Sequence, residues 1–518
     1  MQRKSFQRRK KKDTQIKLKQ ILLLSLLVSL ILFADAYRRG DVKLYQDSPS
    51  ASVKPSSQTK TGEKTEPAAT AAKAAEDHSN QNQTVDQKKI RVLLTTTAFS
   101  STYHGQIVIA GTKGMTVSQG TQKKKYSAGE KVTLSSSDKS NGKTIFQPVS
   151  SGKLQLLSVN RQNRHPKYRG VLEVKWTKQG LTLINELTLE EYLYAVVPSE
   201  LSTGQPMEAL KAQAVCARTY ACIHFSSERY EEYDADMDDT TACQVYNNIP
   251  EDKRSREAVK ETAGQTVTQN DKLVSTYYYS TSWGKSASGK EVWNTDSDIP
   301  YLKSCMQTEN QGNGAEYNLS TESAFRNFLQ KKDTFTYDSD ADWYRWKLRL
   351  SANSLTARID SLLASCYYSD ATKVLTQTAS GKYQSRPLKP MGEIRKMRIE
   401  KREKSGLVTE LVIVGTENVV KVCSQYNIRQ VLSPGSANIY YGAGKTTMSI
   451  LPSAAFYFED DINANGNLDF IIYGGGCGHG TGMSQCGAVE MAEQGKKYQD
   501  ILKYYFSDCE VVVKSINK

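Results

Sequence analysis

From residue 90 to about residue 185, the chain consists of short segments in which hydrophobic and polar positions follow strand-like patterns. Residues 90–94 form a strand-like run, and residues 170–176 alternate apolar and polar side chains as a half-buried strand does. Gly, Ser, Asn and Asp turns separate further short segments of this kind. Strand-like patterns return at residues 272–279 and 408–414. Together they predict a β-rich domain.

Helical signals begin at Thr188, which stands three residues before Glu191 in the spacing of a capping box and predicts a short helix. Pro206 suits the first position of a longer helix that continues to Phe225. A capped short helix followed by a long one, in a chain of short strands, indicates mixed architecture.

The second half is less regular. Residues 320–365 are typical of helix mixed with polar loops, and residues 370–388 form a polar excursion. A glycine-rich turn at 474–482 precedes two short helices that are separated at Gly495. Because strands and helices do not alternate regularly, the sequence predicts an α+β fold with several helices rather than a doubly wound sheet.

The N-terminal residues differ from the rest of the 518-residue chain. Residues 1–20 hold nine Lys or Arg and one acidic residue, which accounts for +8 of the net charge of +14, and residues 21–33 are almost entirely Leu, Ile and Val. This order predicts a basic cytoplasmic tail over 1–20 and a signal anchor or cleaved signal peptide over 21–37. Residues 38–89 predict a disordered stalk. We therefore expect the body, residues 90–515, outside the cytoplasm at the cell membrane.

Charge and cysteine content exclude some classes of function. Residues 21–518 together carry only +6, so the body is mildly basic and a nucleic-acid partner is not expected. Nine cysteines form no C-x-x-C pair, and the five histidines are scattered, so we expect no metal site. The odd cysteine number leaves at least one unpaired within the chain, and some of the others can pair.

Three clusters could carry chemistry. Glu200 lies between apolar residues at the junction of two helical segments, where desolvation would raise the pKa of its carboxyl and equip it as a general acid. A surface acid or a helix cap explains the same residue more simply. On the following helix, Lys211 and Arg218 share one stripe, either facing a groove or paired with acids on the outer face.

The second cluster, residues 277–284, groups aromatic and hydroxyl side chains that suit either a sugar or a core at a strand end. The third, residues 474–485, is rich in glycine, which permits close approach of the backbone or a tight turn. It lacks the Gly-Lys-Ser/Thr ending of a phosphate loop. A lone histidine such as His479 is more often a structural hydrogen-bonding group than a catalyst.

The order of the motifs resembles the stage II sporulation protein D family, which includes the amidase-enhancer proteins of the cell wall. The segments that carry the resemblance are 189–193, 197–200, 209–215, 217–220, 278–284 and 478–485. The resemblance spans about residues 90–513, with a variable middle portion at about 306–400. It implies a lytic transglycosylase that acts on peptidoglycan glycan strands stripped of stem peptides and forms anhydro-muramic ends, with a cell-wall amidase as an expected partner.

Residue by residue, the resemblance places the catalytic glutamate at Glu200 and the basic groove residues of the family at Lys211 and Arg218. The expected substrate-binding or supporting residues are Lys211, Arg218, Tyr279, Ser280, Ser282, His479, Ser484 and Gln485. A single carboxyl suffices for this reaction, because the sugar's own 6-hydroxyl replaces water and Glu200 acts first as an acid and then as a base.

Several positions depart from the family pattern. Leu201 and Ser202 stand where Met-Pro is common, Tyr279 replaces a frequent histidine, and Trp283 replaces a usual glycine. The cysteine and histidine residues with which some members bind zinc are missing apart from Cys243. Two other hypotheses therefore stay open: a non-catalytic wall-binding protein that recruits or enhances an amidase, and a structural member of a membrane complex.

Overall fold

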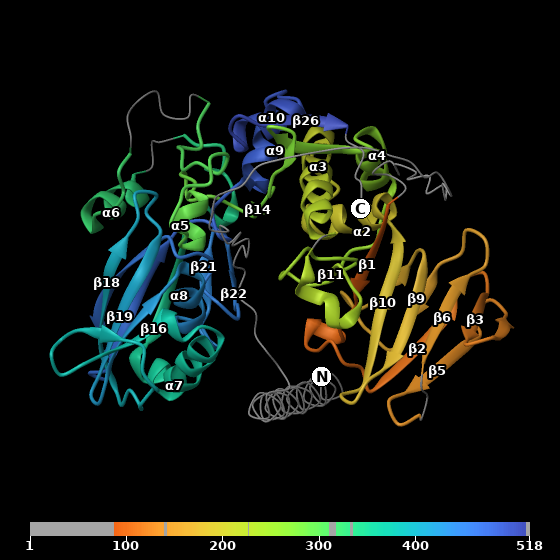
Figure 1. Ribbon diagram of the computed structural model, residues 1–518. Coiled ribbons are helices and arrows are strands. Elements are labelled where there is room, and N and C mark those ends of the chain that lie inside the picture. Colours follow the sequence, from red (N-terminus) through yellow and green to blue (C-terminus); the bar gives the residue numbers. More distant parts are fainter. Residues whose placement is uncertain (1–87, 139–141, 226, 310–316, 332–334, 514–518) are drawn as a thin grey trace, which may run out of the picture.

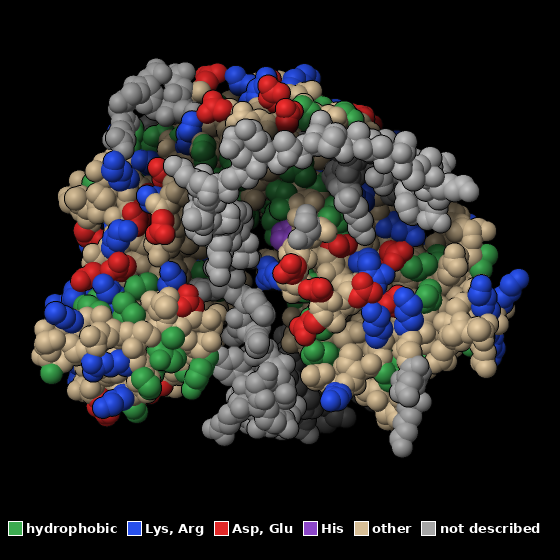
Figure 2. Space-filling view, in the orientation of Figure 1, with side chains coloured by type: hydrophobic (Ala, Val, Ile, Leu, Met, Phe, Trp, Pro, Cys, Tyr) green, Lys and Arg blue, Asp and Glu red, His purple; other side chains and the backbone are tan. Residues whose placement is uncertain are grey.

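Two β-rich lobes lie on either side of a group of helices in the computed structural model (Figure 1). The structure describes residues 88–138, 142–225, 227–309, 317–331 and 335–513. Strands and helices occur in irregular order along the chain, so the predicted α+β class is confirmed. On the face seen in Figure 2, acidic and basic side chains are interspersed over both lobes.

The N-terminal lobe consists of two antiparallel sheets whose inward-facing residues form one core. The larger sheet has the order β11-β1-β10-β9-β6-β3-β4, in which only β11 pairs in parallel, and the smaller has the order β5-β2-β7-β8. Ile107, Phe146 and Leu172 are fully buried between them. The strands are β1 (Lys89–Leu93), β2 (Gln106–Gly111), β3 (Met115–Gln119), β4 (Gln122–Tyr126), β5 (Lys131–Ser135), β6 (Lys143–Pro148), β7 (Leu154–Leu156), β8 (Lys167–Tyr168), β9 (Val171–Trp176), β10 (Leu181–Thr188) and β11 (Met237–Asp238).

The long helix α3 lies at the centre of the helical group. Its many alanines are fully buried, and small side chains let α2, α4, α9, α10 and β12 pack closely around it. One side of α3 belongs to the core of the N-terminal lobe, and the other packs against α9 and α10. The elements of this group are α2 (Leu189–Glu200), α3 (Met207–His224), α4 (Lys253–Glu261), β12 (Gln265–Gln269), β13 (Lys272–Leu273), β14 (Tyr278–Tyr279), β25 (Met483–Ser484), α9 (Gln485–Glu493), α10 (Tyr498–Tyr505) and β26 (Glu510–Val513). The short helix α5 (Gly289–Trp293) packs instead against the core of the second lobe.

The second lobe has two five-stranded sheets, with the orders β22-β21-β15-β24-β23 and β17-β16-β20-β19-β18, around a separate core. Its elements are α6 (Glu322–Gln330), β15 (Trp346–Ser351), α7 (Ala352–Ser369), β16 (Val374–Gln377), β17 (Tyr383–Gln384), β18 (Ile394–Arg402), β19 (Val408–Gly415), β20 (Val419–Cys423), α8 (Gln425–Val431), β21 (Ile439–Tyr441), β22 (Gly444–Thr446), β23 (Phe456–Ile462) and β24 (Leu468–Gly474). Short 3-10 turns are η2 (Thr97–Phe99), η3 (Glu228–Tyr233), η4 (Asp342–Tyr344) and η5 (Ala371–Lys373).

Most element-level predictions hold, and three need correction. The predicted strand over residues 272–279 is two short strands, β13 and β14, in different sheets. The polar excursion at 370–388 contains β16 and β17. The helix that begins after the Thr188 cap continues to Glu200, so Glu200 ends a helix instead of lying between two.

The predicted cytoplasmic tail, anchor and most of the predicted stalk fall in residues 1–87, outside the described part of the chain. Among the described residues, no helix has the length and apolar character that a membrane crossing requires. All nine cysteines lie in the described ranges and are free thiols.

Candidate active site

Glu200 is the last residue of α2, and two local features place it there. The Thr188 hydroxyl accepts the Glu191 N–H at 3.3 Å and starts the helix. Leu201 then adopts an extended backbone, and its N–H donates to the Val197 carbonyl at 2.9 Å. A carboxyl at this end of a helix meets the negative end of the helix dipole, which disfavours its ionised form.

The environment of the Glu200 carboxyl favours a proton. Burial raises its pKa to about 7, although two donors, the Val245 N–H and the Tyr278 hydroxyl, lower the pKa by binding the ionised form. The Val245 N–H donates to Glu200 Oε1 at 2.7 Å. In the described part of the chain, no cationic side chain forms an ion pair with this carboxyl. Glu200 can therefore give and take a proton near neutral pH.

A chain of hydrogen bonds orients the Tyr278 hydroxyl. The Tyr192 hydroxyl donates to Gln244 Oε1 at 3.3 Å, and Gln244 Nε2 donates to the Tyr278 oxygen at 3.0 Å. Because the Tyr278 oxygen accepts from Gln244, its hydrogen is directed to Glu200. Gln244 and Val245 are adjacent, so one loop supplies both supports of the carboxyl.

The glycine-rich segment reaches the same place through Gln485. Strand β25 pairs in parallel with β14, with Tyr278 opposite Met483 and Tyr279 opposite Ser484. Gln485 follows at once, and its Nε2 donates to the Glu200 backbone carbonyl at 3.0 Å and to Gln213 Oε1 at 3.3 Å. Gln485, predicted from sequence, thus lies beside the end of α2 that carries Glu200.

The glycines permit close contact between residues 477–483 and 277–283. A Cβ on Gly482 would lie 2.1 Å from the Tyr277 carbonyl oxygen, and one on Gly480 would lie 2.5 Å from the Trp283 ring. Both glycines also have a positive φ, at which other residues are strained. The glycine-rich segment therefore makes the close backbone approach that was predicted, and its partner is the aromatic segment 277–283 of the same chain.

His479 lies among aromatic rings. Its ring centroid is 5.6 Å from those of Tyr279 and Trp293 and 6.1 Å from that of Tyr277. Burial, together with the nearby Arg429 charge, lowers the pKa of His479 to about 4, so the ring is neutral at physiological pH. Its Nδ1 accepts the Thr481 N–H at 3.2 Å. These contacts give His479 a supporting position beside the backbone of Tyr278.

Two of the predicted serines bind a buried carboxylate that the sequence did not single out, Asp338. The Ser282 hydroxyl donates to Asp338 Oδ2 at 2.8 Å, the Ser282 N–H donates to Oδ1 at 2.8 Å, and the Ser484 hydroxyl also donates to Oδ1. Burial raises the pKa of Asp338 to about 6. Ser280 instead bonds with the neighbouring Thr281 hydroxyl at 3.1 Å. Ser282 and Ser484 therefore join the two motifs to each other.

The expectation that Arg218 faces a groove is wrong. Arg218 is fully buried, and its Nε and Nη2 donate to the two oxygens of Glu190 at 2.6 and 2.7 Å. Lys211 pairs with Glu208 at 3.0 Å and with Glu261 at 2.7 Å. The two residues do lie on one stripe of α3, but both form ion pairs with acidic side chains of α2, α3 and α4. The alternative of pairing with acids is the one found.

Tyr279 and Trp283 also belong to the interior. The Tyr279 hydroxyl is buried and has no hydrogen-bond partner in the described structure. Trp283 is 1% exposed, and its Nε1 donates to the Ser405 carbonyl at 2.9 Å. Neither side chain is therefore placed to contact a substrate, and of the two roles expected for Tyr279, substrate binding or support, its burial fits support. Of the adjacent tyrosines, it is Tyr278 that contacts Glu200.

Sequence reasoning missed Val245, Gln244, Tyr278 and Asp338. Only Tyr278 left a signal, because alternation along a strand places Tyr278 and Tyr279 on opposite sides and made one of them a candidate. Nothing in the sequence distinguishes Asp338 from other acids of the middle portion. Among the described residues, no group of three His, Cys, Asp or Glu is placed to hold a metal ion.

Residues 177–269 match the family model described as stage II sporulation protein, and residues 287–482 match a model described as a domain of unknown function. The first segment contains Glu200, and the second ends in the glycine-rich segment. The two most informative parts of the site therefore lie in different matched segments.

Three relatives are similar over about two thirds of the chain. The chain is 28% identical over 347 residues to an uncharacterized protein of Brachyspira hyodysenteriae, which covers 67% of this chain and 72% of that protein. It is 27% identical over 329 residues to the amidase enhancer of Bacillus subtilis, covering 61% of this chain but 39% of the enhancer. It is 26% identical over 342 residues to stage II sporulation protein D of Bacillus subtilis, covering 63% and 75%. These similarities support the resemblance to the stage II sporulation protein D family.

Proposed function

We propose that this protein is a peptidoglycan lytic transglycosylase in which Glu200 is the acid and the base, working on the cell wall, in sporulation if its host forms spores. The observation that carries the proposal is the Glu200 carboxyl with a pKa of about 7, held by the Val245 N–H and the Tyr278 hydroxyl and free of an ionic partner in the described chain. The similarity to stage II sporulation protein D supports the wall as the place of action.

The reaction needs one carboxyl group that acts twice. Protonated Glu200 gives its proton to the glycosidic oxygen, and the bond from that oxygen to the anomeric carbon of the muramic acid unit breaks. The 6-hydroxyl of the same sugar then bonds to the anomeric carbon, and the Glu200 carboxylate takes the hydroxyl proton. The products are a strand end with an anhydro ring and a free hydroxyl on the leaving sugar. The carboxyl ends protonated, ready for another turnover.

The two donors set the balance between these roles. The Val245 N–H and the Tyr278 hydroxyl stabilise the carboxylate that forms after the first proton transfer. Burial acts against them and keeps about half of the carboxyl groups protonated at neutral pH. Since both supports come from neutral groups, neither competes for the proton that Glu200 must deliver.

The pH dependence of cleavage provides a test of this arrangement. Because Glu200 must be protonated, activity should fall as the pH rises through about 7. A Tyr278→Phe variant loses a donor to the carboxylate, so the Glu200 pKa should rise and the alkaline limb of kcat/KM should move up by about half to one pH unit. Tyr279→Phe is the matched control, because its hydroxyl has no partner to lose. An unshifted limb in Tyr278→Phe would assign the titration to another group.

Product analysis tests the reaction itself. The full-length protein should convert peptide-stripped glycan strands into products with anhydro-muramic ends, which mass spectrometry separates from reducing ends by the mass of one water. Reducing ends would mean hydrolysis and would direct attention to a second carboxylate. Binding without any cleavage would favour the other candidate below.

The second candidate is a non-catalytic protein that enhances a wall amidase. The similarity to the amidase enhancer of Bacillus subtilis favours it, and so does the large second lobe, whose core is separate from that around Glu200. Under this proposal the partner is an amidase and the glycan strand is only a binding surface. A Glu200→Gln variant that still enhances an amidase at full strength, with no glycan products, would support it.

A further inference from the structure

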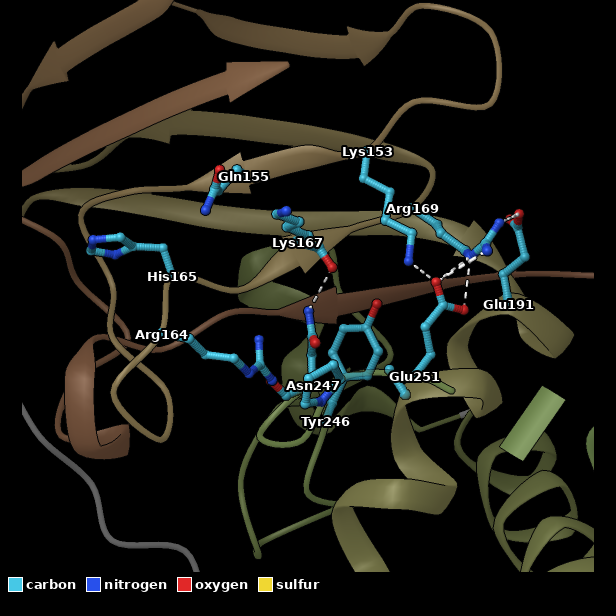
Figure 3. A pocket seen from close by; sticks show the side chains of 12 residues that line it. Lys153, Gln155, Arg164, His165, Lys167, Arg169, Glu191, Tyr246, Asn247 and Glu251 are labelled. Atoms are coloured by element: carbon cyan, nitrogen blue, oxygen red, sulfur yellow. Dashed lines mark hydrogen bonds and ion pairs between the residues drawn. The ribbon is translucent and has the colours of Figure 1, made fainter. Parts of the chain in front are cut away.

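A second polar cavity lies in the N-terminal lobe, away from the Glu200 carboxyl. It has a volume of about 330 Å³ and is bounded by β7, β8, the first turns of α2 and the loop at residues 246–251 (Figure 3). Glu191 and Ala195 are its contacts on α2. At about 100° per residue, Glu200 projects from the opposite side of that helix. The cavity is therefore a site distinct from the one described above.

The cavity has an excess of positive charge. Four cationic side chains line it, Lys153, Arg164, Lys167 and Arg169, against two carboxylates, Glu191 and Glu251. Burial and the neighbouring cations lower the pKa of Lys153 to about 8, although its ammonium contacts Glu251. Beyond burial, which acts most strongly, the neighbouring cations thus also disfavour the charged form of Lys153.

The carboxylates are concentrated on one side. Figure 3 shows Lys153 and Arg169 directed at Glu251, and Arg169 lies 3.1 Å from Glu251 and 3.5 Å from Glu191. Within the described residues, neither Arg164 nor Lys167 has a carboxylate partner. Arg164 Nη2 donates to the Asn247 carbonyl at 2.7 Å, while its Nε is buried with no acceptor. A buried donor of this kind is costly unless a partner arrives.

We propose that this cavity binds an anionic group, a phosphate or a carboxylate, carried by a carbohydrate polymer, with Arg164 and Lys167 as its cationic contacts. The amides of Gln155 and Asn247, which also line the cavity, suit the hydroxyls of an attached sugar or polyol. That the polymer belongs to the cell wall rests on the proposed function, whereas the binding of an anion does not.

One loop joins this cavity to the Glu200 site. Val245 donates to the Glu200 carboxylate, and Asn247, two residues later, lines the cavity and donates its N–H to the Ala195 carbonyl at 3.3 Å. A polymer held at Arg164 and Lys167 would therefore be anchored on the side of α2 opposite Glu200, connected to that residue through the 245–247 loop, and would not contact the reacting bond. The cavity is a positioning site for substrate, distinct from the reacting centre.

Calorimetric titration of the full-length protein at low salt tests the proposal with inorganic phosphate as the first probe. Lys167→Glu reverses a charge on an exposed side chain and should weaken phosphate binding at least tenfold. Glu251→Gln removes a competing carboxylate and should tighten binding about tenfold, a gain that misfolding does not produce. The matched control is Lys125→Glu, an exposed lysine of β4 in the same lobe, which should bind within about twofold of the wild type.

The source of the anion is then distinguished by two further probes, an oligomer of glycerol phosphate and N-acetylmuramic acid, with neutral N-acetylglucosamine as the blank. Preference for the oligomer assigns a phosphate polymer, and preference for muramic acid assigns the glycan carboxylate. Absence of binding by all anions, or equal binding in Lys167→Glu and Lys125→Glu, overturns the proposal.

The experiments distinguish failure of the anion-binding proposal from failure of the Glu200 proposal. If the cavity binds anions and Glu200 is not catalytic, phosphate binding persists in the wild type and in Glu200→Gln while no anhydro ends form. If Glu200 is catalytic and the cavity binds nothing, anhydro ends form at equal rates in the wild type and in Lys167→Glu, and the titrations are flat.

Discussion

Replacing Glu200 by glutamine is expected to reduce glycan cleavage by at least about 10²–10⁴-fold, the usual contribution of a general acid or base. Glutamine has the shape of the glutamic acid side chain and retains an oxygen that can accept the Val245 N–H. It has no acidic proton to deliver to the glycosidic oxygen and cannot take one from the 6-hydroxyl. Rates of formation of anhydro ends, measured by mass spectrometry on peptide-stripped strands, give the comparison.

The matched control for this loss is Glu257→Gln. Glu257 is an exposed acid on α4, a helix that packs against α2, so its replacement changes the net charge equally and leaves the Glu200 contacts intact. It should cleave like the wild type. A Glu200→Gln protein that cleaves within about tenfold of the wild type would exclude Glu200 as the acid and favour the amidase-enhancing candidate.

The same variant should also change the pH dependence of stability. Folding raises the pKa of Glu200 to about 7, so between the unfolded pKa of about 4.3 and pH 7 the native state holds a proton that the unfolded state has released. Stability is therefore lost as the pH rises through this window. Glu200→Gln removes that loss and should be stabilised relative to the wild type above pH 7, by up to about 3 kcal/mol before solvent screening reduces it. Urea unfolding at pH 5 and pH 8 measures the difference.

Local signals in the sequence were sufficient for the elements that hold the site. The Thr188 cap sets the start of α2, and the small residues after Pro206 set α3, whose observed bounds are Met207–His224. The helices on either side of Gly495 are likewise present. Each of these signals acts within a few residues of chain, where capping and periodicity are physical causes.

The pairing of β14 with β25 could not be foreseen in this way. Each strand has two residues, too few for a period, and about 200 residues separate them in the sequence. A shift of one residue in that register would exchange Tyr278 and Tyr279 between the Glu200 side and the Asp338 side. The local sequence is the same in both registers. It therefore contains no signal that favours Tyr278 over Tyr279 as the residue that contacts Glu200.

The partners of buried charged side chains are a second feature that the sequence does not predict. The stripe that joins Lys211 and Arg218 follows from helix geometry, but whether a cation on it meets solvent or an acid depends on neighbouring helices. Glu190 lies in the first turn of α2 and pairs with Arg218 of α3, and Glu261 ends α4 and pairs with Lys211. The resemblance to the family favoured the interpretation in which Lys211 and Arg218 face a groove. The tertiary contacts instead show both side chains paired with acids.

The contact between Arg218 and Glu190 leads to a large expected effect on stability. Arg218→Met leaves the Glu190 carboxylate close to the core without its bidentate partner, and the free energy of unfolding should fall by about 3–5 kcal/mol. Glu190→Gln should cost a similar amount, since it leaves the arginine fully buried and unpaired. Urea unfolding at neutral pH measures both. The double variant should lose less than the sum of the two, because no uncompensated charge remains.

Lys211→Met is the control that separates structure from substrate binding. Its ion pairs with Glu208 and Glu261 are partly exposed, so its loss should cost within about 1 kcal/mol. If Arg218 acts only through the fold, Arg218→Met should cleave strands at the wild-type rate per folded molecule at low temperature, where enough of it is folded. The folded fraction and the affinity for glycan strands are measured on the same sample. If Arg218→Met cleaves more slowly per folded molecule, Arg218 contacts the glycan directly, after a rearrangement that exposes its side chain. Because the pair joins α2 to α3 and Glu200 ends α2, such an outcome would mean that opening of this ion pair controls the Glu200 site, in addition to stabilising the fold around it.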